Sequence, residues 1–343
     1  ENIKSLIKDR LEKENIKVKN ENYFFTPKRI TIIFYGLKLE IESSKNLIKG
    51  PRYDSPEKAV IGFAASLKTK KSNLIIKNTE KGKYFFFKNT KKPNLKKLMQ
   101  TILETELKKI AWKKSMKWGA NTLRWARPLK NILCLFGNKK LLFSYGHLSS
   151  TDFTLELQQL VDKKYKVNSV SHYFSLMKQF GVMISQEERR KNILLDIEKT
   201  THKKNLFIKK DIKLLHEVSN LVEKPYIFLA KFRESFLKLP SEILITTMKK
   251  NQKYFPLYDS ENNLSNYFIL VSNNRSRDNG KTIIEGNQRV VNARLEDALF
   301  FWERDNKKKL QHYSEKLNKI IFHSEIGSIY EKVIRLEKLA LFL

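Results

Sequence analysis

Two pairs of apolar runs, each joined by a short polar turn, constrain the fold most strongly. The first pair spans residues 127–146 and turns at Gly137 and Asn138, and the second spans residues 253–274 and turns between Asp259 and Asn263. Gly, Asn and Asp tolerate the backbone angles of tight turns, so each pair predicts an antiparallel hairpin. Helical patterns lie between the strand-like runs without a regular βαβ alternation. The predicted class is therefore α+β, with mixed helices and largely antiparallel sheets.

Helical periodicity places several further elements. Residues 1–16 and 94–116 read as amphipathic helices, another helix is expected to begin near Pro56, and residues 29–43 and 83–89 read as strands. In the helix expected from Arg289 onward, Val291, Leu295, Ala298 and Trp302 lie within about 60° of one another on a helical wheel. Arg289 projects to the opposite, solvent side of that wheel.

Other local signals concern helix ends. Ser241 is a good N-cap residue, and the Glu that follows it is favourable in a first turn. The middle of the chain, residues 149–210, is less regular, with two helical patterns that separate at Gly181.

The net charge is the clearest compositional signal. The 343 residues include 68 Lys and Arg against 36 Asp and Glu, which gives a formal charge of +32. Such an excess favours a nucleic acid or an anionic membrane surface as partner. Codon bias toward Lys, Asn and Ile would produce part of the same excess, so charge alone does not decide between binding and bias.

The cysteine count and the lengths of the apolar stretches predict the cellular compartment. Cys134 is the only cysteine, which excludes a disulfide framework and predicts a core residue in a reducing, cytoplasmic setting. No apolar stretch approaches the roughly 20 residues of a membrane span, and no signal peptide is visible. The sequence lacks an initiator Met and stops within an apolar pattern, so a longer chain is expected.

Motifs of catalysis are absent from the sequence. It contains no phosphate-binding GxxxxGK[ST] loop, no GxGxxG and no GxSxG, and its six histidines are scattered. Residues 111–119, "AWKKSMKWG", share the composition of an ATP-binding KMSKS loop, but their order differs and no HIGH-type element precedes them. We therefore predict no catalytic residues and no metal site in this chain.

Three clusters combine cations with aromatic residues, a mixture that suits phosphates and unstacked bases. The candidate nucleic-acid-binding residues in them are Lys117, Arg124, Lys249, Lys250, Lys253, Tyr254, Arg275, Arg277 and Arg289.

Each cluster also has a structural interpretation. Trp118 and Trp125 can be core anchors instead of base platforms. In the run from Tyr254 to Tyr258, successive side chains point to opposite faces of a strand, and one face must be core. We predict that the core face holds Phe255 and Leu257. The three lysines before this run are then free to face phosphate, with Tyr254 beside a sugar or base, or they are a solvated helix end.

Eight segments in order resemble the β subunit of the bacterial heterotetrameric glycine–tRNA ligase. They include "TPKRITI", "SPEKAVIGFA", "LRWARPLKNILCLFG", "FLKLPSEILITTMKKNQKYFPLYD", "GNQRVVNARLEDALFFWERD" and "IFHSEIGSIYEKVIRLEKLA". The resemblance spans nearly the whole sequence. It departs after the Cys134 hairpin, where the family has a Gly-His-Arg-containing segment and residues 145–160 read "YGHLSSTDFTLELQQL".

The resemblance implies an architecture and a division of labour. It implies an N-terminal α+β region over residues 1–145, an editing-domain-like α+β region with a basic surface over 146–305, and the start of an all-α HD-like domain over 306–343. It also implies that this chain is the N-terminal half of a subunit that binds glycine tRNA. The separate α subunit, in an α2β2 tetramer, would carry the catalytic core and use ATP and Mg²⁺.

Two alternatives remain open. One is an RNA-binding or deacylase-type, editing-like module that acts outside glycine charging. The other is a purely structural subunit that binds its α partner.

Overall fold

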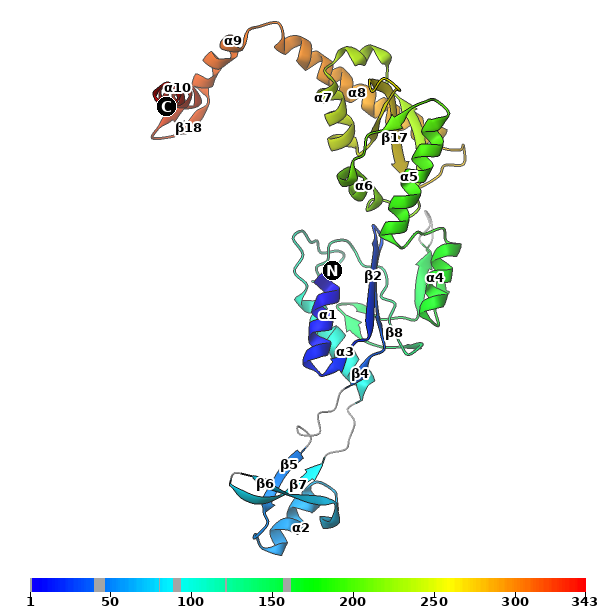
Figure 1. Ribbon diagram of the computed structural model, residues 1–343, viewed down its shortest axis with the longest axis vertical. Coiled ribbons are helices and arrows are strands. Elements are labelled where there is room, and N and C mark those ends of the chain that lie inside the picture. Colours follow the sequence, from blue (N-terminus) through cyan, green and yellow to red (C-terminus); the bar gives the residue numbers. More distant parts are fainter. Residues whose placement is uncertain (1, 40–46, 80, 89–93, 121, 157–161) are drawn as a thin grey trace. The chain divides into compact units, whose positions relative to one another are not determined.

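The computed structural model describes residues 2–39, 47–79, 81–88, 94–120, 122–156 and 162–343 (Figure 1). This part of the chain forms two compact units. Unit 1 comprises residues 1–24 and 29–182, and unit 2 comprises residues 25–28 and 183–343. Unit 1 ends at Val182. The region boundaries expected at residues 145 and 305 stay predictions. Both units combine helices with antiparallel strand pairs, which confirms the α+β class.

A four-stranded antiparallel sheet is the centre of unit 2, with strand order β14-β16-β17-β15. Its strands are β14 (Phe207–Ile208), β15 (Tyr226–Lys231), β16 (Phe255–Tyr258) and β17 (Leu264–Ser272). The helical segments around it are α5 (Gln186–His202), α6 (Ile212–Ser219), η3 (Glu234–Lys238), α7 (Ser241–Thr246), η4 (Thr247–Gln252) and α8 (Lys281–Asp305).

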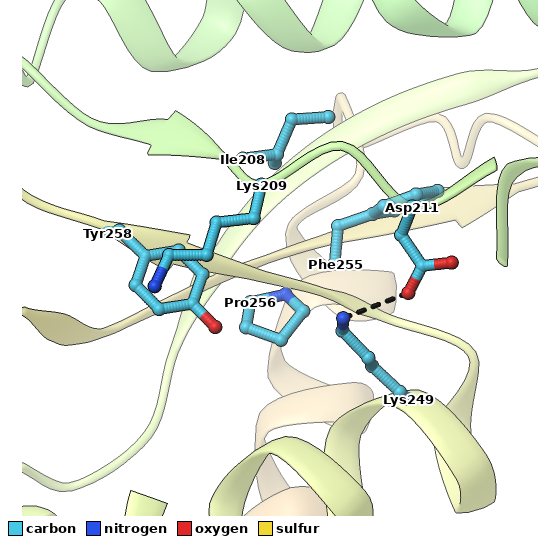
Figure 2. Close-up of a pocket in the computed structure, with 7 residues that line it drawn as sticks. All are labelled: Ile208, Lys209, Asp211, Lys249, Phe255, Pro256 and Tyr258. Carbon is cyan, nitrogen blue, oxygen red and sulfur yellow. Dashed lines mark hydrogen bonds and ion pairs between the residues drawn. The ribbon is translucent and has the colours of Figure 1, made fainter. Parts of the chain in front are cut away.

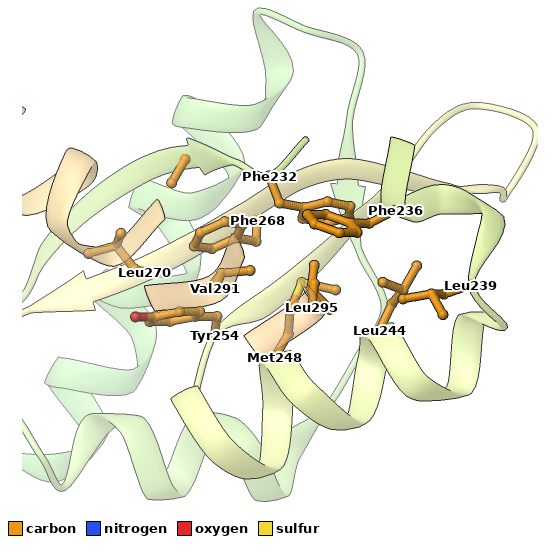
Figure 3. Packing of buried hydrophobic residues seen from close by; sticks show 11 residues of the cluster. Phe232, Phe236, Leu239, Leu244, Met248, Tyr254, Phe268, Leu270, Val291 and Leu295 are labelled. Carbon is orange, nitrogen blue, oxygen red and sulfur yellow. The ribbon is translucent and has the colours of Figure 1, made fainter. Parts of the chain in front are cut away.

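Both faces of this sheet are buried. Phe268 and Leu270 pack with side chains of α7, η4 and α8 on one face, as Figure 3 shows. Phe255 and Leu257 pack with side chains of α5 and α6 on the other face. All four residues of β16 are buried as a result, because the strand lies inside the sheet and helices cover it on both sides.

Unit 1 contains short antiparallel pairs and four α-helices in its described residues. Its helical segments are α1 (Asn2–Lys13), α2 (Glu57–Ser66), η1 (Lys71–Asn73), α3 (Leu95–Glu106), η2 (Leu107–Lys109) and α4 (Val170–Gln179). Its strands are β1 (Ile16–Lys17), β2 (Asn20–Thr26, whose end belongs to unit 2), β3 (Arg29–Tyr35), β4 (Lys38–Leu39), β5 (Leu47–Arg52), β6 (Leu74–Thr79), β7 (Gly82–Lys88), β8 (Leu135–Phe136), β9 (Lys139–Lys140), β10 (Ser144–Tyr145), β11 (Leu148–Ser149), β12 (Phe153–Glu156) and β13 (Lys163–Lys166).

Residues 306–343 contain both helix and strand. They form α9 (Leu310–Ser314), η5 (Glu315–Lys319), a short hairpin of β18 (Ile321–His323) and β19 (Gly327–Ser328), and α10 (Ile329–Phe342). The all-α HD-like domain implied for this end of the chain stays a prediction.

The turn chemistry predicted both hairpins correctly. Strands β8 and β9 meet at Gly137 and Asn138, which both have positive φ, and β16 and β17 meet at a turn that the Asp259 carboxylate closes. Cys134 is partly buried between two core clusters, and burial raises the pKa of its thiol to about 12. The predicted core role of this cysteine is confirmed.

Three local predictions were wrong. Ser241 is the first residue of α7 instead of its N-cap, a position that Pro240 occupies. Helix α3 ends at Glu106, well before residue 116, and Trp112 then joins a cluster with Trp125. Trp302 is 40% exposed, because the core contacts of α8 end at Leu299.

Parts of four other predictions lie outside the described residues, and two of them extend there by one residue each, namely residue 1 of the helix expected over 1–16 and residue 89 of the strand expected over 83–89. The other two parts are residues 40–43 of the strand expected over 29–43 and residues 157–160 of the altered segment.

Candidate nucleic-acid interface

The segment from α7 to β16 contains a widened helical turn. Helix α7 continues into η4, which is a π-helix, and the N–H of Tyr254 donates to the carbonyl of Met248 at 3.0 Å. Lys253 ends the turn with φ of 60°, in the left-handed region that few non-glycine residues adopt. Such π turns add a residue to a helix and are frequent at functional sites.

Two of the three lysines in this turn form ion pairs with acidic residues next to or within α6. Lys249 Nζ lies 2.8 Å from Asp211 Oδ2, and Lys253 Nζ lies 2.8 Å from Glu217 Oε1. Both pairs are partly exposed. Each ion pair compensates the positive charge of its lysine within the protein. This compensation reduces the attraction between each lysine and a phosphate.

Asp211 has two roles in this arrangement. Its Oδ1 accepts the N–H of Leu214 and so caps α6, while its Oδ2 accepts from Lys249. Burial alone would raise the pKa of Asp211, but these hydrogen bonds outweigh burial and lower it below its usual value. The carboxylate is consequently charged at neutral pH and holds Lys249 in place.

Lys250 and Tyr254 have opposite surroundings. Lys250 is exposed, as a phosphate contact requires. Tyr254 is only 7% exposed, its ring stacks on Phe268 with centroids 4.9 Å apart, and its hydroxyl donates to Asn287. Burial raises the pKa of Tyr254 to about 12. Its proposed place beside a sugar or base is corrected to a place in the core, because the ring has no open face.

A small depression borders the Lys249–Asp211 pair (Figure 2). Lys209 lies at its edge, with Nζ 3.9 Å from the centroid of the Tyr258 ring. Lys209 was not among the predicted site residues, since it follows a strand too short to recognise. The depression combines the Lys209 ammonium, which lies over an aromatic ring, with the Lys249 ammonium, which is paired to a carboxylate.

The loop before α8 presents Arg275 and Arg277. Both are exposed, and Arg275 donates to Asn279 Oδ1 at 2.8 Å. Asp278 organises the loop: it accepts from the hydroxyls of Ser276 and Thr282 and from the Thr282 N–H at 2.8 Å. These hydrogen bonds, that of Ser276 foremost, hold the pKa of Asp278 well below its usual value.

Gly280 joins this loop to α8. It has φ of 95°, and a Cβ built there would lie 2.1 Å from the Phe228 ring, so no larger residue fits. Farther along α8, Arg289 is exposed and Val291 and Leu295 are fully buried, as predicted. The loop and helix thus expose all three arginines that were predicted in unit 2.

Lys117 and Arg124 belong to unit 1, whereas the other candidates belong to unit 2. Lys117 is exposed, while the Arg124 guanidinium donates to the hydroxyl and the carbonyl of Ser115, each at 3.1 Å. Trp125 is buried and packs edge-on against Trp112, and Trp118 is partly buried at the same cluster. The core interpretation of both predicted tryptophans is therefore confirmed.

The most elaborate polar contacts in unit 2 involve residues that the sequence did not predict. Arg189 is fully buried and donates to the carbonyls of Phe25, Met183, Ile184 and Ser219. Burial lowers its pKa to about 10, and the nearby charge of Glu223 opposes that shift. In the sequence "EERRK", Arg189 resembles a solvated helix face. Only its spacing of four residues from Ile193 could have placed Arg189 on the buried face of α5.

Within the described ranges, no group of three His, Cys, Asp or Glu side chains is placed to hold a metal ion. No helix in the described part of the chain has the length and apolar character of a membrane span.

Comparison with known proteins decides the family. The model of the family described as "Glycyl-tRNA synthetase beta subunit" matches residues 1–343. The chain belongs to this family. It is 36% identical over 325 residues to the glycine–tRNA ligase beta subunit of Rickettsia typhi, a match that covers 94% of this chain and 49% of that protein.

A second relative has the same printed name. The glycine–tRNA ligase beta subunit of Rickettsia akari is also 36% identical, over 311 residues that cover 90% of this chain and 47% of that protein. The chain therefore spans about half the length of these relatives.

Proposed function

We propose that this chain is the N-terminal half of a glycine–tRNA ligase β subunit that binds glycine tRNA and leaves catalysis to a partner. The observation that carries the proposal is the family match over all 343 residues. The relatives are named as a subunit of an aminoacyl-tRNA ligase, which implies a partner subunit.

The charge of the chain supports the tRNA-binding part of the proposal. The formal charge of +32 favours a polyanion, and Lys117, Lys250, Arg277 and Arg289 are exposed where phosphates can approach. We assign no base recognition to Tyr254, because its ring is in the core.

The partner would carry the chemistry. We assign ATP and Mg²⁺ to an α subunit in an α2β2 assembly, working in the cytoplasm, and no bound cofactor to this chain. The β subunit would hold the tRNA so that its acceptor end reaches the α subunit. None of the described contacts favours an editing-type hydrolysis over this role.

Glycine charging tests the proposal directly. The full-length chain is assayed with ATP, Mg²⁺ and glycine tRNA, with and without the α subunit from the same organism. We expect charging only when both subunits are present. Charging by this chain alone would reveal a catalytic centre of its own, whereas tRNA binding without charging by the pair would indicate an RNA-binding protein with another task.

A further inference from the structure

A small sheet with one open face lies between residues 47 and 88. Strands β5, β7 and β6 pair in that order, all antiparallel, and α2 lies on one side of them (Figure 1). Phe63 of α2 reaches Gly50 of β5 so closely that a Cβ there would lie 2.3 Å from its ring. Phe85 of the central strand is buried.

The strand register assigns side chains to the two faces. Residues directly opposite each other in a sheet share a face, and neighbours along a strand alternate. Phe85 is paired with Ile76 and belongs to the face that α2 covers. Tyr84 and Phe86 must therefore lie on the opposite face, where α2 provides no cover.

Cations surround the two aromatic residues on this open face. Lys77 is opposite Tyr84, and Lys49 is opposite Phe86. Lys49 Nζ lies 3.6 Å from the centroid of the Tyr84 ring. Arg52 is also opposite Tyr84, and its guanidinium lies over Gly82, where a Cβ would be 3.3 Å away. Both lysines and the arginine are exposed, and both rings are half-buried.

The charge of this stretch complements a polyanion. Residues 47–88 contain ten Lys and Arg against three Asp and Glu. Two of the acids pair with cations: Asp54 lies 3.5 Å from Arg52, and Glu57 lies 2.6 Å from Lys71. No acidic residue is among the described members of the open face, which are Leu47, Lys49, Arg52, Ile75, Lys77, Thr79, Gly82, Tyr84 and Phe86.

We propose that this open face binds RNA, with unpaired bases on Tyr84 and Phe86 and phosphates on Lys49 and Lys77. The inference rests on the proposed function and adds a specific surface to it. Aromatic residues on an open antiparallel sheet offer flat platforms for splayed bases, as in other sheet-based RNA-binding modules. An acidic protein surface would use the cations but leave the rings without a matching group, so we favour RNA.

Two double variants test the phosphate contacts. Lys49→Ala with Lys77→Ala removes two cations from the open face. Lys58→Ala with Lys83→Ala is the matched control, since it removes two exposed cations from α2 and from the other face of β7. The full-length chain with its α subunit is titrated with glycine tRNA at several salt concentrations. We expect the log–log slope to fall by roughly 1.4 to 1.8 in the first variant only.

Single substitutions at Tyr84 test the stacking. Tyr84→Leu keeps apolar bulk and removes the ring, whereas Tyr84→Phe keeps the ring. We expect a loss of affinity for glycine tRNA of about five-fold to a hundred-fold with leucine and little change with phenylalanine. The thermal midpoint of each variant is measured alongside, and affinity lost only through unfolding would contradict stacking.

The outcomes separate this proposal from the one on which it rests. If the wild-type assembly fails to bind glycine tRNA, both proposals are overturned. If it binds and the two double variants show equal slopes, the open-face proposal alone is overturned. Loss of α association with unchanged tRNA affinity would also overturn it, because the face would then bind the partner.

Discussion

Lys249 and Lys250 are neighbours in the sequence, yet their ammonium groups have different surroundings. Lys249 is paired with Asp211 at 2.8 Å, and Lys250 is exposed. We expect Lys250→Ala to lower the log–log salt slope of glycine-tRNA binding by roughly 0.7 to 0.9, because a free cation releases counterions when it meets phosphate. Lys249→Ala should change the slope less, since its charge is already compensated.

The thermal midpoints of the same two variants provide a control. Lys249→Ala should lower the thermal midpoint, as it removes a partner of the residue that caps α6, whereas Lys250→Ala should leave the midpoint unchanged. Equal slope losses in the two variants would contradict the structural distinction. An unchanged slope in both variants would indicate that the turn is a solvated helix end and does not contact phosphate.

At the scale of elements, Asp278 connects the arginine-bearing loop to α8. The hydrogen bonds of Ser276 and Thr282 lower the pKa of Asp278. A lowered folded-state pKa stabilises the loop above the unfolded value of about 4, and the stabilisation is lost as pH falls through the folded value. Amide exchange at Thr282 should therefore stay slow at neutral pH and become faster, relative to its intrinsic rate, only in strong acid.

A substitution isolates the contribution of this carboxylate. Asp278→Asn should speed exchange at Gly280 and Thr282 at pH 7 and remove the acid-dependent loss of protection. Asp297→Asn, which changes an exposed residue of α8, is the matched control and should do neither. Slow exchange in the Asp278 variant at neutral pH would show that the loop keeps its form without the charge.

The elements differ in how far the sequence could predict them. Gly137 and Asn138 made their hairpin predictable, because tight turns require residues that tolerate positive φ. The alternation in β16 predicted Phe255 and Leu257 as core, but it could not show that α8 covers the other face as well. The π turn in η4 adds one residue to the helix, and nothing in the composition of the segment signals it. The spacing of apolar residues therefore could not predict that Tyr254 is buried.

At the scale of the whole chain, unit 2 includes four residues from near the N-terminus. Residues 25–28 belong to it, and Thr26 Oγ1 donates to Glu223 at 2.9 Å although 197 positions separate the two residues. Arg189 also donates to the Phe25 carbonyl at 2.8 Å. The sequence could not indicate this pairing, since neither a small hydroxyl nor a glutamate between a helix and a strand stands out as a long-range contact.

Thr26→Val should therefore destabilise unit 2 and spare unit 1. The valine leaves buried Glu223 without one of its donors, at a cost of about 1–3 kcal/mol. Thr31→Val is the matched control, because Thr31 shares its hydroxyl contact with Tyr173 inside unit 1. Hydrogen exchange followed by mass spectrometry should show faster exchange over residues 183–223 in the first variant and over residues 29–35 and 170–179 in the second. Faster exchange throughout the chain with either variant would mean that the two units unfold as one, against the division that the structure describes.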